Sequence, residues 1–216
     1  MLITIAGGHG TIARQLTRLL VDDGHRVRSL VRKPDQFGDI EAVGGTPVLA
    51  DLEAMDAGEL ADVVGDADAV VFAAGSGPGS GAERKETVDH RGAVLLIDAA
   101  KRRNVAHYVI ISSMGADANH EGDEVFDAYL RAKGRADDAL RDSGLGYSIV
   151  RPTRLTDDEA TDQVELGPAA NGDAIPRADV AAVLKELVVG TGPLDATVQL
   201  TAGSTRIAEA VQARSS

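Results

Sequence analysis

The sequence contains no cysteine, and its acidic residues outnumber its basic ones by 34 to 22. Without cysteine the chain has no disulfide, no thiolate metal ligand and no cysteine nucleophile. Its five histidines show no paired spacing of the kind that metal sites use, so we predict no metal. The formal net charge of −12 is spread along the chain, and such a field repels nucleic acid phosphates and anionic membranes. We therefore expect neither as a partner.

Long apolar runs are also missing. No run approaches the roughly 20 residues that cross a bilayer, and the first one, Leu2–Ala6, lacks the basic flank of a signal peptide. We expect a cytoplasmic protein. The 216 residues, 44 % of them hydrophobic, are enough for one well-buried core, and we expect residues 1–216 to form a single domain.

Short β-branched runs alternate with stretches of helical periodicity through most of the chain. We expect strands at residues 2–6, 26–31, 46–50, 69–74, 107–112 and 147–151. We expect helices at residues 11–20, 58–64, 88–103 and 127–143. Strands separated by helices form βαβ units, which predict an α/β fold: a Rossmann-like, doubly wound parallel sheet with helices on both faces.

After Pro152 the pattern loosens. It suggests a short strand at 163–166, a helix at 178–189, a strand at 197–201 and a last helix from 205 to the end. This segment is too short for an independent domain. We expect it to complete the same sheet, with residues 153–204 forming one wall of a substrate cleft.

A glycine-rich loop joins the first expected strand to the first helix. Gly7 permits a tight turn, Gly10 lets the backbone approach a pyrophosphate closely, and the small Ala13 lets the helix pack on the strand. The helix N-terminus presents free N–H groups to the phosphates. The loop residues predicted to bind a dinucleotide are Gly7, Gly8, His9, Gly10, Thr11 and Ile12.

The end of the second strand distinguishes the two nicotinamide cofactors. Sites for NAD usually carry an acid there, whereas this strand ends in Arg32 and Lys33, with no acid until Asp35. Both cations suit a 2′-phosphate, so we favour NADP(H) over NAD(H); the alternative is a pair of solvated charges in a turn. Asp51 and Leu52, after the third strand, are placed beside the adenine, although Asp51 could equally cap a helix.

In order along the chain, these segments resemble the atypical short-chain dehydrogenases/reductases, in particular their small single-domain NAD(P)-binding group. NmrA-like proteins, biliverdin and flavin reductases and sugar epimerases are related to that group. The resemblance depends on residues 7–13, 30–32, 73–75, 88–89, 111–113, 129–133, 149–152 and 175–180. It implies that Ala74 and Gly75 lie along the ribose and phosphates, and that Pro152 and Thr153 approach the nicotinamide.

Tyr129 and Lys133 are four residues apart on an expected helix, so they share one face. In active members of the superfamily such a lysine holds the nicotinamide ribose, and its charge favours the ionised tyrosine. The tyrosine then exchanges a proton with the substrate while a hydride moves to or from the nicotinamide. The resemblance gives Ser113, or next Ser112, the role of positioning the reacting oxygen. The alternative is that Tyr129 only covers the edge of the core.

Several functions remain open. The first is an NADP(H)-dependent oxidoreductase acting on a small carbonyl or quinone, because the chain lacks the larger C-terminal domain with which related epimerases grip nucleotide sugars. The others are a non-catalytic redox sensor, an epimerase, and direct hydride transfer to a planar, flavin-like acceptor. Residues 75–81 could be a flap over the cofactor or a plain surface loop, and Asp89 and His90 could approach the cofactor or cap a helix. We expect a monomer or a homodimer.

Overall fold

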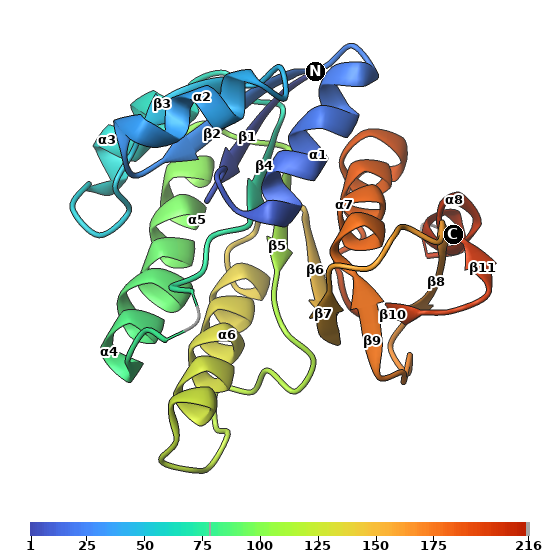
Figure 1. The fold of residues 1–216 in the computed structure, drawn as a ribbon. Helices are drawn as coiled ribbons and strands as arrows, with labels where there is room; N and C mark the ends of the chain where they lie inside the picture. The colour runs from blue at the N-terminus through green and yellow to red at the C-terminus, as the bar shows by residue number, and fades with distance from the viewer. Residues whose placement is uncertain (78, 215–216) are drawn as a thin grey trace.

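The computed structural model describes residues 1–77 and 79–214, in which a nine-stranded sheet has the order β11-β8-β10-β6-β5-β4-β1-β2-β3 (Figure 1). The strands are β1 (Leu2–Ala6), β2 (Arg26–Val31), β3 (Thr46–Leu49), β4 (Ala69–Phe72), β5 (His107–Ile111), β6 (Tyr147–Pro152), β7 (Arg154–Thr156), β8 (Gln163–Gly167), β9 (Ala174–Pro176), β10 (Ala196–Ala202) and β11 (Thr205–Arg206). From β3 across to β10 all neighbours are parallel, while β8 runs antiparallel to both β10 and β11. Strands β7 and β9 form a separate parallel pair.

Helices cover both faces of the sheet, which confirms the predicted Rossmann-like α/β fold. The α-helices are α1 (Thr11–Asp22), α2 (Phe37–Glu41), α3 (Ala57–Val64), α4 (Ala82–Arg84), α5 (Gly92–Arg102), α6 (Val125–Arg141), α7 (Arg177–Glu186) and α8 (Ile207–Gln212). The short turns η1 (Pro34–Gln36), η2 (Lys85–Arg91) and η3 (Leu187–Thr191) complete the set.

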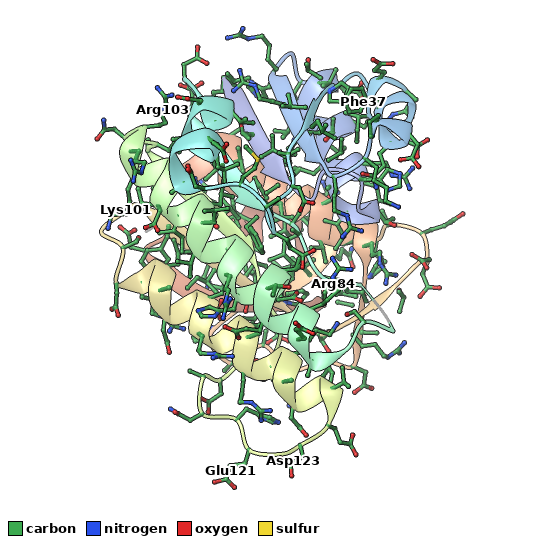
Figure 2. All side chains as sticks on the ribbon, turned by 90° about the vertical axis from the view of Figure 1, so that its left-hand side faces the viewer. Phe37, Arg84, Lys101, Arg103, Glu121 and Asp123 are labelled. Atoms are coloured by element: carbon green, nitrogen blue, oxygen red, sulfur yellow. The ribbon has the colours of Figure 1, made fainter. Side chains whose placement is uncertain are left out.

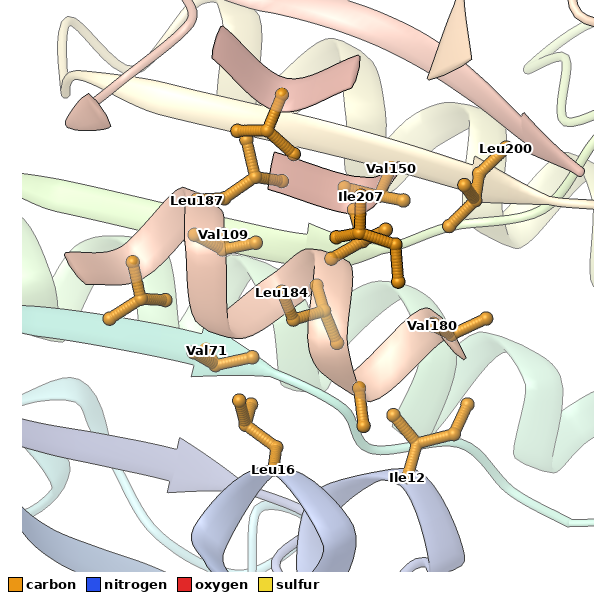
Figure 3. Close-up of a cluster of buried hydrophobic side chains, with 14 of the residues drawn as sticks. Ile12, Leu16, Val71, Val109, Val150, Val180, Leu184, Leu187, Leu200 and Ile207 are labelled. Atoms are coloured by element: carbon orange, nitrogen blue, oxygen red, sulfur yellow. The ribbon is translucent and has the colours of Figure 1, made fainter. Parts of the chain in front are cut away.

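The core has two halves because successive side chains of each strand point to opposite faces of the sheet. On one face α1, α7 and α8 enclose a cluster that includes Leu16 and Leu184 (Figure 3). On the other face α3, α5 and α6 enclose a second cluster around Phe72 and Tyr108. Most charged side chains of the helices lie on their outer faces, as Figure 2 shows for Lys101 on α5.

Several boundaries differ from those predicted. The middle helix starts earlier than residue 88, because the π-helical turn η2 precedes α5 without a break. The last segment first forms β11 and only then α8, which ends at Gln212; residues 215 and 216 lie outside the described part. The strand predicted at 69–74 ends at Phe72, which frees the next residues to form a loop. None of the described helices has the length and apolar character needed to span a membrane.

The strand order determines where a ligand can bind. The chain leaves β1 toward β2 and β3, and then returns to place β4 on the other side of β1. The loops that follow β1 and β4 therefore diverge to opposite sides of the sheet, and open α/β sheets bind ligands in the crevice at such a point.

Candidate active site

The glycine-rich loop lies against the loop that follows β4. Gly7 has a φ of +77°, and a Cβ on it would lie 2.5 Å from the Cα of Ala74. The N–H of Gly10 donates to the carbonyl of Gly7 at 3.0 Å, which closes a tight turn at the start of α1. Gly10 is the N-cap of α1 and makes no side-chain capping bond, so no side chain competes for the first N–H groups of the helix. This arrangement leaves the helix N-terminus free to bind phosphate.

On one side of this loop a cavity of about 260 Å³ opens over the ends of β2 and β3. Of the predicted cofactor residues it is lined by Gly7, His9, Gly10, Arg32, Asp51, Leu52, Ala74 and Gly75. A side chain of Asp51 accepts from the N–H of Glu53 at 3.0 Å, so it also stabilises the turn after β3. We call this cavity the adenosine half, after the part of the cofactor that the sequence predicts beside Arg32 and Asp51.

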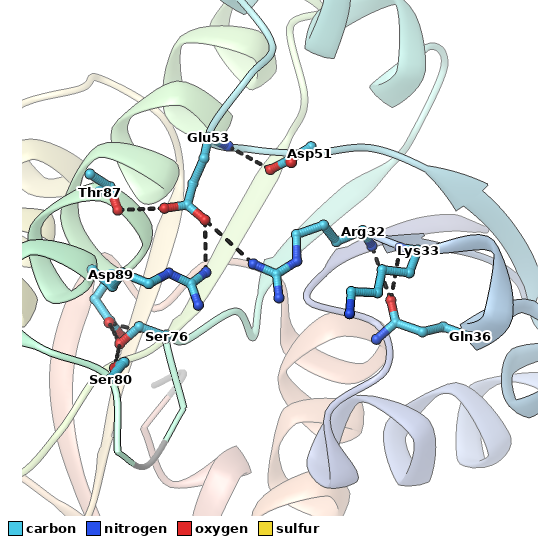
Figure 4. Close-up of polar contacts among 10 residues, drawn as sticks. Arg32, Lys33, Gln36, Asp51, Glu53, Ser76, Ser80, Thr87 and Asp89 are labelled. Carbon is cyan, nitrogen blue, oxygen red and sulfur yellow. Dashed lines mark hydrogen bonds and ion pairs between the residues drawn. The ribbon is translucent and has the colours of Figure 1, made fainter.

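Two arginines, Arg32 and Arg84, and one glutamate, Glu53, meet in the adenosine half, and Figure 4 shows the contacts of Glu53 with Arg32 and Thr87. Glu53 Oε2 lies 2.7 Å from Nη2 of Arg84 and 3.5 Å from Nη1 of Arg32, and the Thr87 hydroxyl donates to Glu53 Oε1 at 2.6 Å. The hydrogen bond from Thr87, then that from Arg84 and the charges of both arginines, lower the pKa of the Glu53 carboxyl. Glu53 and Arg84 were not predicted as site residues.

On the other side of the loop a larger and mainly apolar cleft of about 790 Å³ extends over the ends of β4 and β5. Its apolar walls include Ile12, Ile111 and Leu155, and it contains the predicted Tyr129 and Lys133. Phe126 stacks on Tyr129 with ring centroids 5.8 Å apart, and 61 % of Phe126 is exposed. We call this cleft the substrate half.

The two halves adjoin, because Gly10 and the segment from Ala73 to Ser76 line both of them. An extended ligand can therefore cross the glycine-rich loop and place one end in each half.

Lys133 is held firmly at the floor of the substrate half. Its side chain is 4 % exposed, its Nζ donates to the carbonyl of Ile111 at 3.0 Å, and it lies 3.6 Å from Oδ1 of Asp89. Asp89 is itself buried and accepts from both the N–H and the hydroxyl of Ser76 through Oδ2. Lys133 Nζ also lies 5.8 Å from the centre of the Tyr129 ring. The ammonium group is thus fixed beside the tyrosine by a buried carboxylate that was not predicted to contact it.

The two serines after β5 are placed differently. Ser112 lines the substrate half, but its hydroxyl donates to Oδ2 of the buried Asp137 at 2.8 Å. Ser113, the serine that we predicted, is not among the lining residues, and its hydroxyl donates to the carbonyl of Met114 at 3.2 Å. In this arrangement neither serine directs its proton into the cleft.

Asp137 is the centre of a buried polar group beneath that serine. Arg151 donates to Asp137 Oδ2 from Nε at 2.9 Å, and its Nη2 lies 2.8 Å from the same oxygen. Burial raises the pKa of the Asp137 carboxyl, and the neighbouring guanidinium opposes this shift. The group fixes the end of β6 against α6.

Comparison with known proteins shows the family to which the chain belongs. Residues 7–189 match the family described as NAD(P)H-binding. The chain belongs to this NAD(P)H-binding family, within the atypical short-chain dehydrogenases/reductases. Its full length is similar to the Bacillus subtilis protein YhfK, which is named as an uncharacterized sugar epimerase: the two are 33 % identical over 98 % of this chain and 99 % of YhfK.

Two solved structures show the same fold. A Bacillus halodurans protein that carries the name of an NAD-dependent epimerase/dehydratase is 34 % identical, with a TM-score of 0.89 over 99 % of both chains. The Lactococcus lactis oxidoreductase ylbE is 26 % identical, with a TM-score of 0.84 over 99 % of this chain and 96 % of its own.

Some of the remaining predicted residues line the two halves and others do not. Thr11 and Ile12 line the substrate half, whereas Gly8 lies behind the loop, where an added Cβ would be 2.6 Å from Cβ of Ser29. Lys33, although exposed, is not among the residues that line either half.

The predicted nicotinamide contacts after β6 are also outside the walls of the two halves. Pro152 is the buried last residue of β6, and the Thr153 hydroxyl donates to the carbonyl of Gly172 at 2.9 Å. In the 75–81 loop, Ser80 donates to Ser76 at 2.9 Å, whereas Pro78 lies outside the described residues. No cluster of metal-ligating side chains occurs in the described parts of the chain.

Proposed function

We propose that the chain is an NADP(H)-dependent oxidoreductase that transfers a hydride between the nicotinamide and a small carbonyl or quinone substrate, with Tyr129 as the acid/base. The observation that carries this proposal is the position of Lys133, buried beside Tyr129 in an apolar cleft that is continuous with the glycine-rich loop.

The residues present suit a bound dinucleotide. Backbone of the 73–75 segment approaches Gly7 so closely that no side chain fits between them, and the uncapped N-terminus of α1 faces the same space. The cofactor supplies the hydride chemistry; the chain supplies the phosphate site at α1 and cations for the adenosine end.

Lys133 can serve both cofactor and tyrosine. An ammonium group has three donors, and one of them is already directed to Ile111 O. A second faces Asp89 at 3.6 Å, which leaves one to bind a ribose hydroxyl in the cleft. Its ammonium group also lies 5.8 Å from the centre of the Tyr129 ring, and both side chains line the same cleft.

The lining of the substrate half supports a small, apolar substrate. Ile12, Ile111, Phe126 and Leu155 give it broad apolar walls, which suit a carbonyl or quinone ring better than a hydroxyl-rich sugar. Arg177 also reaches the wall, where it pairs with Asp157 at 2.8 Å.

A second candidate function is hydride transfer to a planar acceptor without a protein acid. The position of the Ser112 hydroxyl favours it, because a proton donated to Asp137 is not available to polarise a substrate carbonyl. The two candidates differ in their need for Tyr129.

The test combines cofactor binding and turnover in wild type and Tyr129→Phe. Ligand at about 100 times its dissociation constant adds about 2.7 kcal/mol of stability, which corresponds to roughly 5–10 °C in Tm for a domain of this size. We expect NADPH to raise Tm by this amount in both proteins. NADPH oxidation is then followed with a panel of aldehydes, 9,10-phenanthrenequinone and FMN as acceptors. Tyr147→Phe is the matched control, because Tyr147, the first residue of β6, does not line the cleft.

Tyr129→Phe should lower kcat for carbonyl substrates by about 10²-fold or more, the usual size of an acid/base contribution, while Tyr147→Phe leaves it unchanged. Undiminished quinone or FMN reduction by Tyr129→Phe would instead establish the second candidate. Binding of NADPH without turnover of any acceptor would favour a sensor, and no stabilisation by NADPH would refute the proposal.

A further inference from the structure

The adenosine half contains a different second cation from the one that the sequence predicted. Arg32 follows β2, whereas Arg84 ends the short helix α4, more than fifty residues further along the chain. Both guanidinium groups line the same cavity and both pair with Glu53. Lys33, the second cation that the sequence suggested, is not among the lining residues.

Glu53 occupies the position between these cations that a bound anion would take. Its Oε2 pairs with both arginines, 2.7 Å from Nη2 of Arg84 and 3.5 Å from Nη1 of Arg32. A 2′-phosphate has three terminal oxygens and more negative charge than a carboxylate, so it competes for the same guanidinium donors. Two arginines that could bind an oxyanion thus both pair with the carboxylate of Glu53 in this structure.

Glu53 is also anchored independently of the arginines. Thr87 donates to its other oxygen, Oε1, and its backbone N–H donates to Asp51. When a phosphate takes the arginine donors, these two bonds still hold the carboxylate nearby, and the two negative groups repel each other. With NAD(H), by contrast, the carboxylate can accept a hydrogen bond from the 2′-hydroxyl of the ribose.

We propose that Arg84 is a second ligand of the 2′-phosphate of NADP(H), and that Glu53 reduces the preference for NADP(H) over NAD(H) by competing for Arg32 and Arg84. This inference depends on the proposed function, because it assumes that the cofactor's adenosine end lies in this cavity.

Arg84 has the geometry expected of a ligand-binding side chain. Glu53 is its one hydrogen-bonding partner among the described side chains, and its side chain is 38 % exposed within the cavity wall. Removing it therefore takes away little buried structure. Arg91 offers a matched control on the adjacent turn: it is 71 % exposed, pairs with Glu86 and does not line the cavity.

The experiment measures dissociation constants of NADPH and NADH by calorimetry for wild type, Arg84→Ala, Arg84→Gln, Glu53→Gln and Arg91→Ala. Removing one charge-assisted contact should weaken NADPH binding by about tenfold, equivalent to about 1.4 kcal/mol. We expect both Arg84 variants to lose that factor for NADPH and to bind NADH within twofold of wild type. Glu53→Gln should shift the ratio the other way, with tighter NADPH and unchanged or weaker NADH. Arg91→Ala should change neither.

Equal loss of both cofactors in the Arg84 variants, or no loss of either, overturns the role of Arg84. Weaker NADPH binding by Glu53→Gln overturns the competition and shows that the carboxylate instead positions the arginines. These failures differ from failure of the proposed function, in which wild type itself binds neither cofactor. Circular dichroism of each variant confirms that the comparison is between folded proteins.

Discussion

Substitution of Gly7 gives the sharpest test of how closely the glycine-rich loop packs against the loop after β4. An added methyl group would lie 2.5 Å from Cα and 2.6 Å from N of Ala74, both of them backbone atoms that cannot rotate away. Its φ of +77° adds the strain of a left-handed L-residue. That strain costs roughly 1 kcal/mol, and forced overpacking costs roughly 1–3 kcal/mol. We therefore expect Gly7→Ala to lower the free energy of unfolding by about 3 kcal/mol.

The assay is thermal unfolding of the free protein. For a domain of this size, about 3 kcal/mol corresponds to a fall in Tm of roughly 6–12 °C. Gly24→Ala is the matched control, because Gly24 has a φ of +82° but nothing within 4 Å of the added atom. It pays only the backbone strain of roughly 1 kcal/mol, so the difference between the two variants isolates the close approach to Ala74.

Gly10 separates folding from binding in the same loop. An added Cβ there would meet only the carbonyl oxygen of Gly7, at an ordinary 3.4 Å, yet it would project from a residue that lines both halves of the cleft. Gly10→Ala should weaken NADPH binding while lowering Tm by less than Gly7→Ala does. A Gly7→Ala protein as stable as Gly24→Ala would refute the reasoning.

Two further predictions concern buried titratable groups. Burial lowers the pKa of His107 from 6.5 to about 4, so between these pH values the unfolded chain binds a proton that the folded chain does not. The free energy of unfolding should therefore fall as pH drops through this window, by up to about 3 kcal/mol. Urea unfolding measured from pH 7 to 4 should show a smaller loss of unfolding free energy for His107→Gln than for wild type. The same pH dependence in both proteins would contradict this role of His107. Lys133→Met should cost about 3 kcal/mol, because it leaves Asp89 as a buried charge without its cation. Adding Asp89→Asn should restore most of this loss in the same urea assay, because it removes the unpaired charge. A further loss of stability in the double variant would show that the unpaired carboxylate is not the cause.

The sequence predicted best those features that depend on neighbours along the chain. The turn at Gly7, the start of α1 and the central strands follow from local periodicity and the needs of glycine, and they are found where expected. The boundary near Val88 was misplaced, because a helical period of 3.6 residues does not reveal that η2 has a wider, π-helical turn. That turn includes Asp89 and brings it to Lys133.

Features that combine distant segments could not be predicted in this way. Arg32 and Glu53 come from two separate loops and Arg84 from the short helix α4, and only the order of the strands brings these segments together. The identity of the serine facing the cleft depends on where β5 ends. That strand stops at Ile111, and the chain then turns so that Ser112 lines the cleft and Ser113 does not.

The packing of α1 against α7 has a consequence for how the protein is made. The apolar face of α1, with Leu16 and Leu20, is buried with Val180 and Leu184 of α7, and Lys185 of α7 pairs with Asp23 just after α1 at 3.0 Å. A ribosome that has translated the glycine-rich loop must add more than 160 further residues before this cover exists. Until then the growing chain exposes the apolar face of α1 beside the glycine-rich loop. Nascent chains halted before α7 should therefore depend on chaperones, and cofactor binding should be acquired only near the end of synthesis.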